Sequence, residues 1–111
     1  PVPLHPRKKK KRGYNQSEWI ARGLNSLLQL PIDTTSLRRI KETDTQTNKP
    51  TYERWQNVQD IFSVVAPKEL EGKHILLIDD VITTGSTIGA CAEALLTVPG
   101  VRVSILAVAI A

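Results

Sequence analysis

Two adjacent carboxylates are the residues of this sequence whose types and spacing most clearly suggest chemistry. Asp79 and Asp80 directly follow the aliphatic run Ile75–Ile78. A continuous aliphatic run is typical of a strand covered on both faces in a parallel sheet, and ligands of open α/β sheets bind outside the carboxyl ends of such strands. Because ionised carboxylates only accept hydrogen bonds, this pair suits a vicinal diol such as O2 and O3 of a ribose.

A loop of small hydroxyl residues follows the carboxylates. Gly85 lets the backbone turn tightly and approach a ligand, and a helix predicted from about Thr87 directs its free N–H groups and positive dipole end at the same point. These features suit a phosphate monoester, so the whole motif predicts a 5-phosphoribosyl site. The alternative, a loop whose hydroxyls only cap the helix, leaves Asp79-Asp80 unexplained. The residues of this phosphate loop are Thr83, Thr84, Gly85, Ser86 and Thr87.

The last third of the chain contains the elements that must position this site. His74–Val81 is predicted to be a strand, and apolar residues recur with a helical period from Thr87 until Pro99-Gly100 ends the helix. Val101–Ala111 predicts a final strand. Strand, helix and strand make a right-handed crossover between parallel neighbours, so we expect an α/β domain with a mostly parallel twisted sheet flanked by helices.

The earlier part predicts one helix and two short strands. Asn15 fits a helix N-cap with Glu18 three residues on, and Pro31 ends the helix. Ser36–Ile40 and Ile61–Ala66 are candidate strands, and the polar stretch between them is a long loop of the kind that is often functional. The helix is predicted to present one apolar face, made of Ile20, Leu24, Leu27 and Leu28.

Composition and charge fit one small domain of 111 residues. The chain starts at Pro1 and has no methionine, so we expect a piece of a longer protein, with Pro1–Leu4 as a cut strand end. Its net charge is +4, yet the six basic residues of Arg7–Arg12 alone contribute +6. This segment either attracts polyanions, such as diphosphates or nucleic acid, or is a solvated loop.

Other features narrow the function classes. The single cysteine, Cys91, excludes an intrachain disulfide and is expected to be a buried thiol. His5 and His74 lack metal-ligand spacing. No apolar run approaches the ~20 residues of a membrane-spanning helix, and no signal peptide is visible. We therefore expect a cytoplasmic protein.

Three segments resemble a known family. Ile75–Thr87 resembles the signature of type I phosphoribosyltransferases, which binds 5-phosphoribosyl 1-pyrophosphate (PRPP). Arg12–Ser17 is similar to the Arg-Gly-aromatic-Asn-Gln segment of the ComF family, and Arg54–Val58 to its Arg-x-x-Asn-Val segment. Gln46 fits the loop that precedes the latter. The chain thus resembles the ComF (competence protein and amidophosphoribosyltransferase-like) family along nearly its whole length, without that family's N-terminal zinc module.

The resemblance implies roles for these positions. Asp79 and Asp80 would form the catalytic pair that holds the ribose hydroxyls, directly or through water on Mg²⁺, and the phosphate loop would bind the 5-phosphate. Thr43–Thr51 would be a flexible loop that closes over the site. Arg54 and Asn57 either serve the site or only fix their own turn. Candidates near the diphosphate are Arg7, Lys8, Arg12 and Gly13, and those of the flexible loop are Arg38, Arg39 and Arg54.

The resemblance therefore predicts a domain that binds PRPP with Mg²⁺ and transfers its phosphoribosyl group to a nitrogen acceptor. Thr83 stands where hypoxanthine-guanine-type relatives carry an aspartate, which disfavours 6-oxopurine acceptors and leaves the acceptor open. The alternative is a non-catalytic protein of competence and DNA uptake that binds PRPP or a nucleoside monophosphate and contacts single-stranded DNA through Arg7–Arg12. The fold family also suggests a homodimer.

Overall fold

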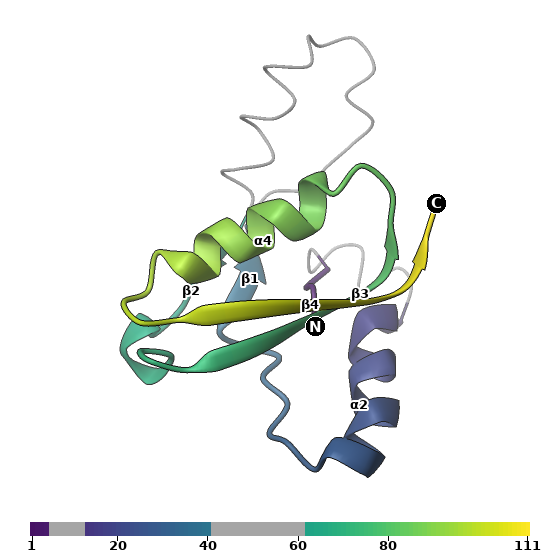
Figure 1. Cartoon of the computed structure of the whole chain (residues 1–111), viewed down its shortest axis with the longest axis horizontal. Coiled ribbons are helices and arrows are strands. Elements are labelled where there is room, and N and C mark those ends of the chain that lie inside the picture. Colours follow the sequence, from purple (N-terminus) through teal and green to yellow (C-terminus); the bar gives the residue numbers. More distant parts are fainter. Residues whose placement is uncertain (5–12, 41–61) are drawn as a thin grey trace, which may run out of the picture.

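The computed structural model describes residues 1–4, 13–40 and 62–111. Figure 1 shows one helix above a pair of long strands and another helix below it. The combination of helices with a parallel strand pair confirms the α/β class. In chain order, the elements are α2 (Gln16–Leu28), β1 (Leu37–Arg39), β2 (Phe62–Val64), the 3-10 helix η1 (Pro67–Glu69), β3 (His74–Ile82), α4 (Ser86–Leu96) and β4 (Arg102–Ile110).

The predicted strand–helix–strand unit is confirmed as β3, α4 and β4. The two strands pair in parallel, from His74 opposite Arg102 to Ile82 opposite Ile110, and α4 makes the crossover between them. The turn after α4 depends on Gly100, whose φ is +74° and where a Cβ would lie 3.1 Å from the backbone of Gly72. Glycine is therefore required there both for its conformation and for this close approach.

The hydrophobic core lies between α4, β2 and the β3–β4 pair. Cys91 is fully buried within it, as the sequence predicted, and burial raises the pKa of its thiol to about 12. A thiol in this environment stays protonated and behaves as a small apolar side chain. The buried core residues are Val2, Phe62, Leu70, Leu77, Ile88, Ala90, Cys91, Leu95, Val98 and Val101.

The two short strands form where the sequence predicted them and make an antiparallel pair of their own. Arg39 lies opposite Phe62, and Leu37 lies opposite Val64. Within the described ranges, β1–β2 and β3–β4 are separate two-stranded sheets. The β1–β2 pair is held beside the rest by the packing of β2 against α4, and Figure 1 shows both short strands beside that helix.

Helix α2 begins as predicted, because the Asn15 side chain accepts a hydrogen bond from the Ser17 amide at 2.9 Å. The predicted apolar face is confirmed only in part, because Ile20 and Leu24 are half-buried. Leu27 is 84% exposed, and the buried residues of the helix are Ser17 and Ala21. The physical reason is that α2 packs on β3 through its first turns, where small side chains allow close approach, whereas its last turn extends beyond the strand and ends at Leu28.

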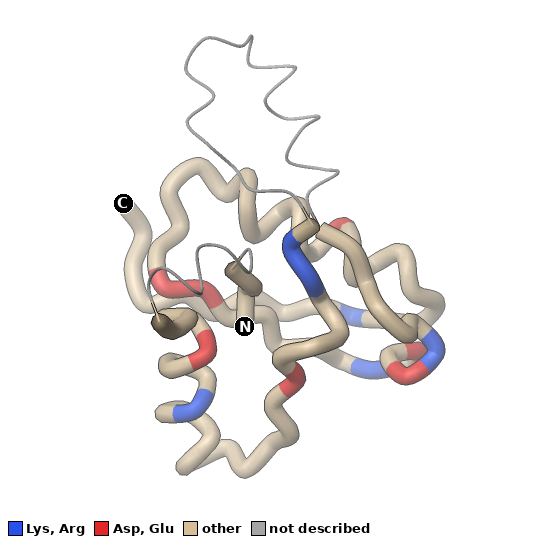
Figure 2. The backbone as a smooth tube through the Cα atoms, turned by 180° about the vertical axis from the view of Figure 1, so that it is seen from behind, with Lys and Arg blue, Asp and Glu red and all other residues tan. Residues whose placement is uncertain are grey.

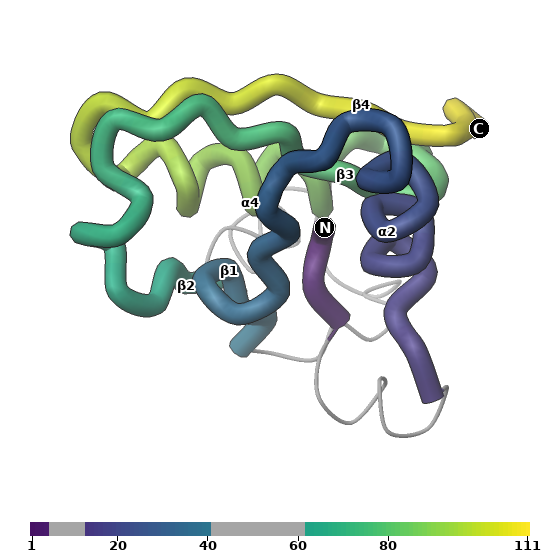
Figure 3. The backbone as a smooth tube through the Cα atoms, turned by 90° about the horizontal axis from the view of Figure 1, so that it is seen from below, coloured from purple at the N-terminus to yellow at the C-terminus, as the bar shows by residue number. Residues whose placement is uncertain are grey.

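The N-terminal segment lies along the edge of β3 that β4 does not occupy. The Val2 amide donates to the Ile78 carbonyl at 2.8 Å, and the Asn15 side-chain amide donates to the Val2 carbonyl at 2.9 Å. Figure 3 shows this segment, in purple, between β1 and α2. In the described part of the chain, no helix has the length and apolar character needed to cross a membrane.

Candidate active site

A cavity of about 280 Å³ opens at the carboxyl end of β3. Its walls come from the N-terminal segment, the start of α2, Arg39 of β1, and the end of β3 with the loop that follows. In Figure 2, the acidic stretch of β3, in red, and the basic stretch of β1, in blue, lie on either side of the N-terminal segment. The fold thus assembles four segments that are distant in sequence around one polar space.

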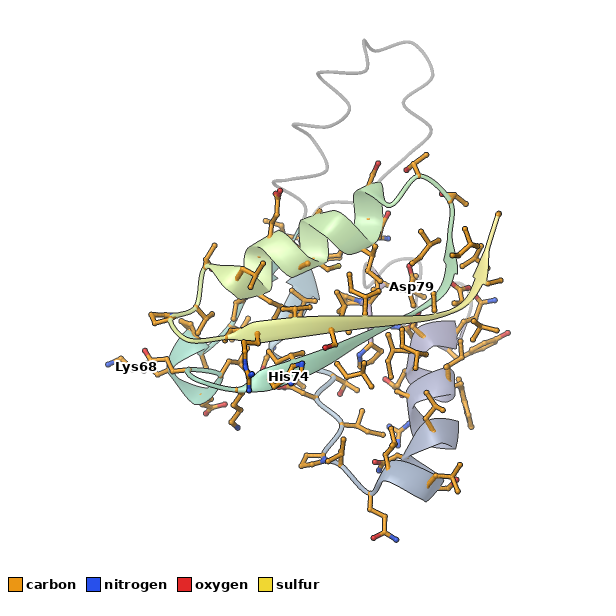
Figure 4. The ribbon with its side chains drawn as sticks, viewed as in Figure 1. Lys68, His74 and Asp79 are labelled. Carbon is orange, nitrogen blue, oxygen red and sulfur yellow. The ribbon has the colours of Figure 1, made fainter. Side chains whose placement is uncertain are left out.

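Asp79 is the more enclosed of the two carboxylates, with 8% of its surface exposed. Its Oδ1 accepts hydrogen bonds from the Ser17 hydroxyl at 3.2 Å and from the Asp80 amide at 2.9 Å. Figure 4 shows Asp79 far along β3 from His74, which lies at the start of that strand. Burial raises the pKa of Asp79 above its ordinary value and the Asp80 carboxyl raises it further, while the two donated hydrogen bonds partly offset the rise.

Asp80 is only half-buried, and its Oδ1 accepts a hydrogen bond from the Val81 amide at 2.8 Å. Both carboxylates line the cavity. Two acids this close repel each other when both are ionised, so the pair favours a ligand that brings hydroxyl donors or a cation. That the pair holds a ribose diol stays a prediction.

The phosphate loop lies beside the acidic pair, but its members have different surroundings. Thr83, Gly85 and Thr87 line the cavity. Thr84 and Ser86 instead bond to each other, with 2.8 Å between their hydroxyl oxygens, and the Thr84 hydroxyl accepts from the Ser86 amide at 3.2 Å. The alternative capping role therefore describes Thr84 in this structure, whereas the other three face the space where a ligand would lie.

Gly85 supplies the backbone shape of this loop. Its φ is +83°, and α4 begins at the next residue with no side-chain cap from Gly85 itself. The first turn of a helix carries N–H groups without intrahelical partners and the positive end of the helix dipole. Since Gly85 and Thr87 both line the cavity, this end of α4 can receive an anion.

The structure separates the two arginines that the sequence named together. Arg39 lines the cavity, its guanidinium lies 5.0 Å from the centroid of the Phe62 ring, and its Nε is buried. That nitrogen has no hydrogen-bond partner among the groups the structure describes. Arg38 is exposed and its Nε donates to the Thr35 carbonyl at 3.2 Å. Of these two arginines, Arg39 is therefore the one placed to meet a ligand.

Several predicted positions lie outside the described residues: Arg7, Lys8, Arg12, Gln46, Arg54, Asn57 and the proposed flexible loop Thr43–Thr51. Gly13 is described and exposed, with φ +92°, shortly before α2. Sequence reasoning missed Ser17 as a member of the site. The only signal near it was the Asn15 cap, which fixes the start of the helix but does not indicate which element that start will touch.

A match to a family extends over residues 8–111, and that family is described as "Phosphoribosyl transferase domain". The chain belongs to this family. The acidic pair and the phosphate loop of this phosphoribosyl transferase domain both fall within the matched residues.

Curated relatives place the domain more narrowly. It is 36% identical over 96 residues to Competence protein F of Haemophilus influenzae, which covers 86% of this chain and 42% of that protein. It is 35% identical over 95 residues to DNA utilization protein YhgH of Escherichia coli, covering 86% of this chain and 41% of that protein. These relatives confirm the resemblance to the ComF family. The chain spans about two-fifths of their length, and no solved structure matches it significantly.

Proposed function

We propose that this phosphoribosyl transferase domain binds PRPP in the cavity at the end of β3 and transfers the phosphoribosyl group to a nitrogen acceptor. One observation carries the proposal: an acidic pair and the glycine-containing start of a helix line the same cavity. The first part suits the ribose diol and the second suits the 5-phosphate. A 5-phosphoribosyl ligand carries both groups.

The ligand would use the site as follows. Asp79 and Asp80 accept hydrogen bonds from the ribose hydroxyls. The amides at the start of α4, with the hydroxyls of Thr83 and Thr87, bind the 5-phosphate. The Thr84 and Ser86 hydroxyls now satisfy each other, and they can exchange that bond for phosphate oxygens when the ligand is present.

Mg²⁺ fits this site as an ion shared with the substrate. In the ranges that the structure describes, no three His, Cys, Asp or Glu side chains gather to hold a metal. Mg²⁺ commonly retains several waters and takes one or two carboxylates together with substrate phosphates, which matches the donor set of Asp79 and Asp80. When bound, the ion supplies positive charge that balances the diphosphate.

The transfer itself requires little covalent chemistry from the protein. The lone pair of the acceptor nitrogen forms a bond to C1 of the ribose while the bond from C1 to the diphosphate oxygen breaks. Diphosphate leaves with that electron pair, and the nitrogen loses its proton to solvent. Catalysis then consists of positioning the reactants and stabilising charge on the leaving group. Arg39, with its buried and unpartnered Nε, is the described residue best placed to accept the diphosphate.

Calorimetric titration of the full chain with PRPP and Mg²⁺ tests the binding claim. We expect Asp80→Asn to weaken binding by about tenfold or more, because hydrogen bonds to charged groups contribute roughly 1.5–3 kcal/mol. Glu71→Gln is the matched control, since Glu71 is an exposed acid in the turn before β3. Absence of PRPP binding, or equal affinity of the wild type and Asp80→Asn, would contradict the proposal.

The acceptor is identified by diphosphate release. Thr83 has no ionisable group at neutral pH, so we expect release with an amine or with a base other than a 6-oxopurine. Release that occurs only with hypoxanthine or guanine would overturn this part of the proposal.

The names of the relatives favour a second candidate, a binding protein that contacts single-stranded DNA without turning PRPP over. Both names refer to competence or to DNA utilization, and the basic segment Arg7–Arg12, outside the described residues, supplies charge for a nucleic-acid backbone. Such binding should weaken steeply as salt concentration rises. Tight PRPP binding without diphosphate release for any acceptor, together with salt-dependent oligonucleotide binding, would favour this candidate.

A further inference from the structure

A buried hydrogen bond links the start of α2 to the acidic pair. The Ser17 hydroxyl donates to Asp79 Oδ1 at 3.2 Å, across 62 positions of sequence. Ser17 is 4% exposed and Asp79 is 8% exposed, and both line the cavity. The bond therefore lies at the cavity wall, where the orientation of the carboxylate decides what the cavity can bind.

Ser17 is itself held firmly by its neighbours. Its amide donates to the Asn15 side chain at 2.9 Å, and the other end of that side chain donates to the Val2 carbonyl at 2.9 Å. The Val2 amide then donates to the carbonyl of Ile78 at 2.8 Å. Because Ile78 precedes Asp79 in β3, these four hydrogen bonds form a closed ring through Asp79, Ser17, Asn15, Val2 and Ile78.

This ring determines how Asp79 presents its two oxygens. Oδ1 already accepts from both Ser17 and the Asp80 amide, so a ligand hydroxyl must use the other oxygen. A carboxylate held at one oxygen by two donors cannot rotate freely about its last torsion. The hydrogen bond that Asp80 Oδ1 accepts comes instead from the Val81 amide, the next residue of its own strand, and not from another element.

We propose that Ser17 is a positioning residue that fixes the Asp79 carboxylate for the ribose hydroxyls and so sets the preference of the site for ribosyl over 2-deoxyribosyl ligands. This inference rests on the proposed function, because it assigns a role to Ser17 in the recognition of the same ligand. A preoriented acceptor discriminates a hydroxyl from its absence better than a mobile one, since no ordering of the acceptor opposes binding.

A purely structural role is the competing explanation. Ser17 would then only satisfy a buried carboxylate, and its loss would affect every ligand equally through stability. The two explanations differ in which ligands lose affinity when the Ser17 hydroxyl is removed. Ribose 5-phosphate carries both hydroxyls, 2-deoxyribose 5-phosphate lacks one, and inorganic phosphate has neither but still suits the start of α4.

The experiment measures the affinities of these three ligands for the full chain carrying Ser17→Ala, with Ser17→Thr as the hydroxyl-retaining variant. Ser26→Ala is the matched control, because Ser26 lies on the same helix and its exposed hydroxyl bonds only to the local Gly23 carbonyl. We expect Ser17→Ala to reduce the preference for ribose 5-phosphate over the deoxy sugar by about threefold to tenfold. Phosphate affinity should stay unchanged, and Ser17→Thr should restore the preference.

Should Ser17→Ala fail to fold, Ser17→Cys keeps the volume with a weaker donor, and a smaller loss of preference is expected. An unchanged preference in either variant, with wild-type ribose 5-phosphate binding intact, would overturn the role of Ser17 and leave the proposed function standing. Absence of PRPP and ribose 5-phosphate binding by the wild type would instead overturn the proposed function itself.

Discussion

Asp79 and Asp80 line the same cavity, yet the two neighbours meet different surroundings. Asp79 faces the start of α2. Its Oδ1 accepts hydrogen bonds from the Ser17 hydroxyl of that helix and from the Asp80 amide of its own strand. Asp80 is half-buried and bonds to the amide of Val81. One carboxylate is therefore fixed by the fold, while the other can adjust to what binds.

The environment of Asp79 predicts a pH dependence of stability. Burial, and then Asp80, raise the pKa of Asp79 in the folded chain, so the folded state binds this proton more tightly than the unfolded state does. Stability should therefore fall as pH rises from the ordinary aspartate pKa through the raised one. The other charged or titratable groups near Asp79 are Arg39 on β1 and Cys91 on α4.

Urea unfolding of the wild type and Asp79→Asn between pH 4 and pH 7 checks this expectation. The stability difference should shift in favour of Asp79→Asn as pH rises, because asparagine has no proton to lose. A difference that is constant across this range would show that the folded carboxyl titrates as it does in the unfolded chain.

The separation of Arg39 from Arg38 predicts different mutational effects. Arg39→Ala should weaken PRPP binding by about tenfold to a hundredfold, since a charge-assisted hydrogen bond contributes roughly 1.5–3 kcal/mol, and Arg38→Ala should change it by less than about twofold, as for other exposed surface charges. Calorimetry should also show a smaller effect of Arg39→Ala on ribose 5-phosphate, which lacks the diphosphate. Equal effects of the two substitutions on PRPP would contradict the assignment.

At the scale of elements, two helices begin at the cavity with different caps. Helix α2 is capped by the side chain of Asn15, which also holds Val2. Helix α4 starts after Gly85, which provides no side chain. At the start of α4 the Thr84 hydroxyl accepts from the Ser86 amide alone, so the proposed 5-phosphate would accept from the amides that remain in that first turn.

The left-handed conformation of Gly85 predicts a loss of stability and of phosphate binding on substitution. Gly85→Ala should cost about 1–2 kcal/mol, since a Cβ is strained at positive φ, and should weaken inorganic phosphate binding. Gly89→Ala is the control, because Gly89 lies within α4 with open space around its Cα. That substitution should stabilise the chain by about 0.5–1 kcal/mol without changing phosphate affinity. Thermal unfolding and titration with phosphate measure both effects.

Across the whole molecule, local patterns predicted the elements well. The aliphatic run before Asp79, the helical period after Thr87 and the stop at Pro99-Gly100 are each readable within a few residues, and they define β3, α4 and β4. The same holds for the Asn15 cap. Each of these signals is local because it depends on backbone conformation or on one covered face.

Contacts between distant segments could not be predicted in this way. The bond from Ser17 to Asp79 depends on where α2 is placed against β3, and the apolar period of Ile20, Leu24, Leu27 and Leu28 did not indicate that Ser17 and Ala21 are the buried residues of the helix. The pattern of Val101–Ala111 predicted a strand but not its exposure, and Val108 and Ile110 are 68% and 82% exposed. The choice of Arg39 over Arg38 also required the strand pairing with β2.

The ring through Val2, Asn15 and Ser17 has one further consequence for the site. A ligand that binds Asp79 should also stabilise the hydrogen bonds that hold Val2 against β3, because each of these bonds shares a residue with the next. Ligand binding and the anchoring of Val2 are therefore thermodynamically coupled. A ligand in the cavity should then slow proteolytic cleavage near Val2.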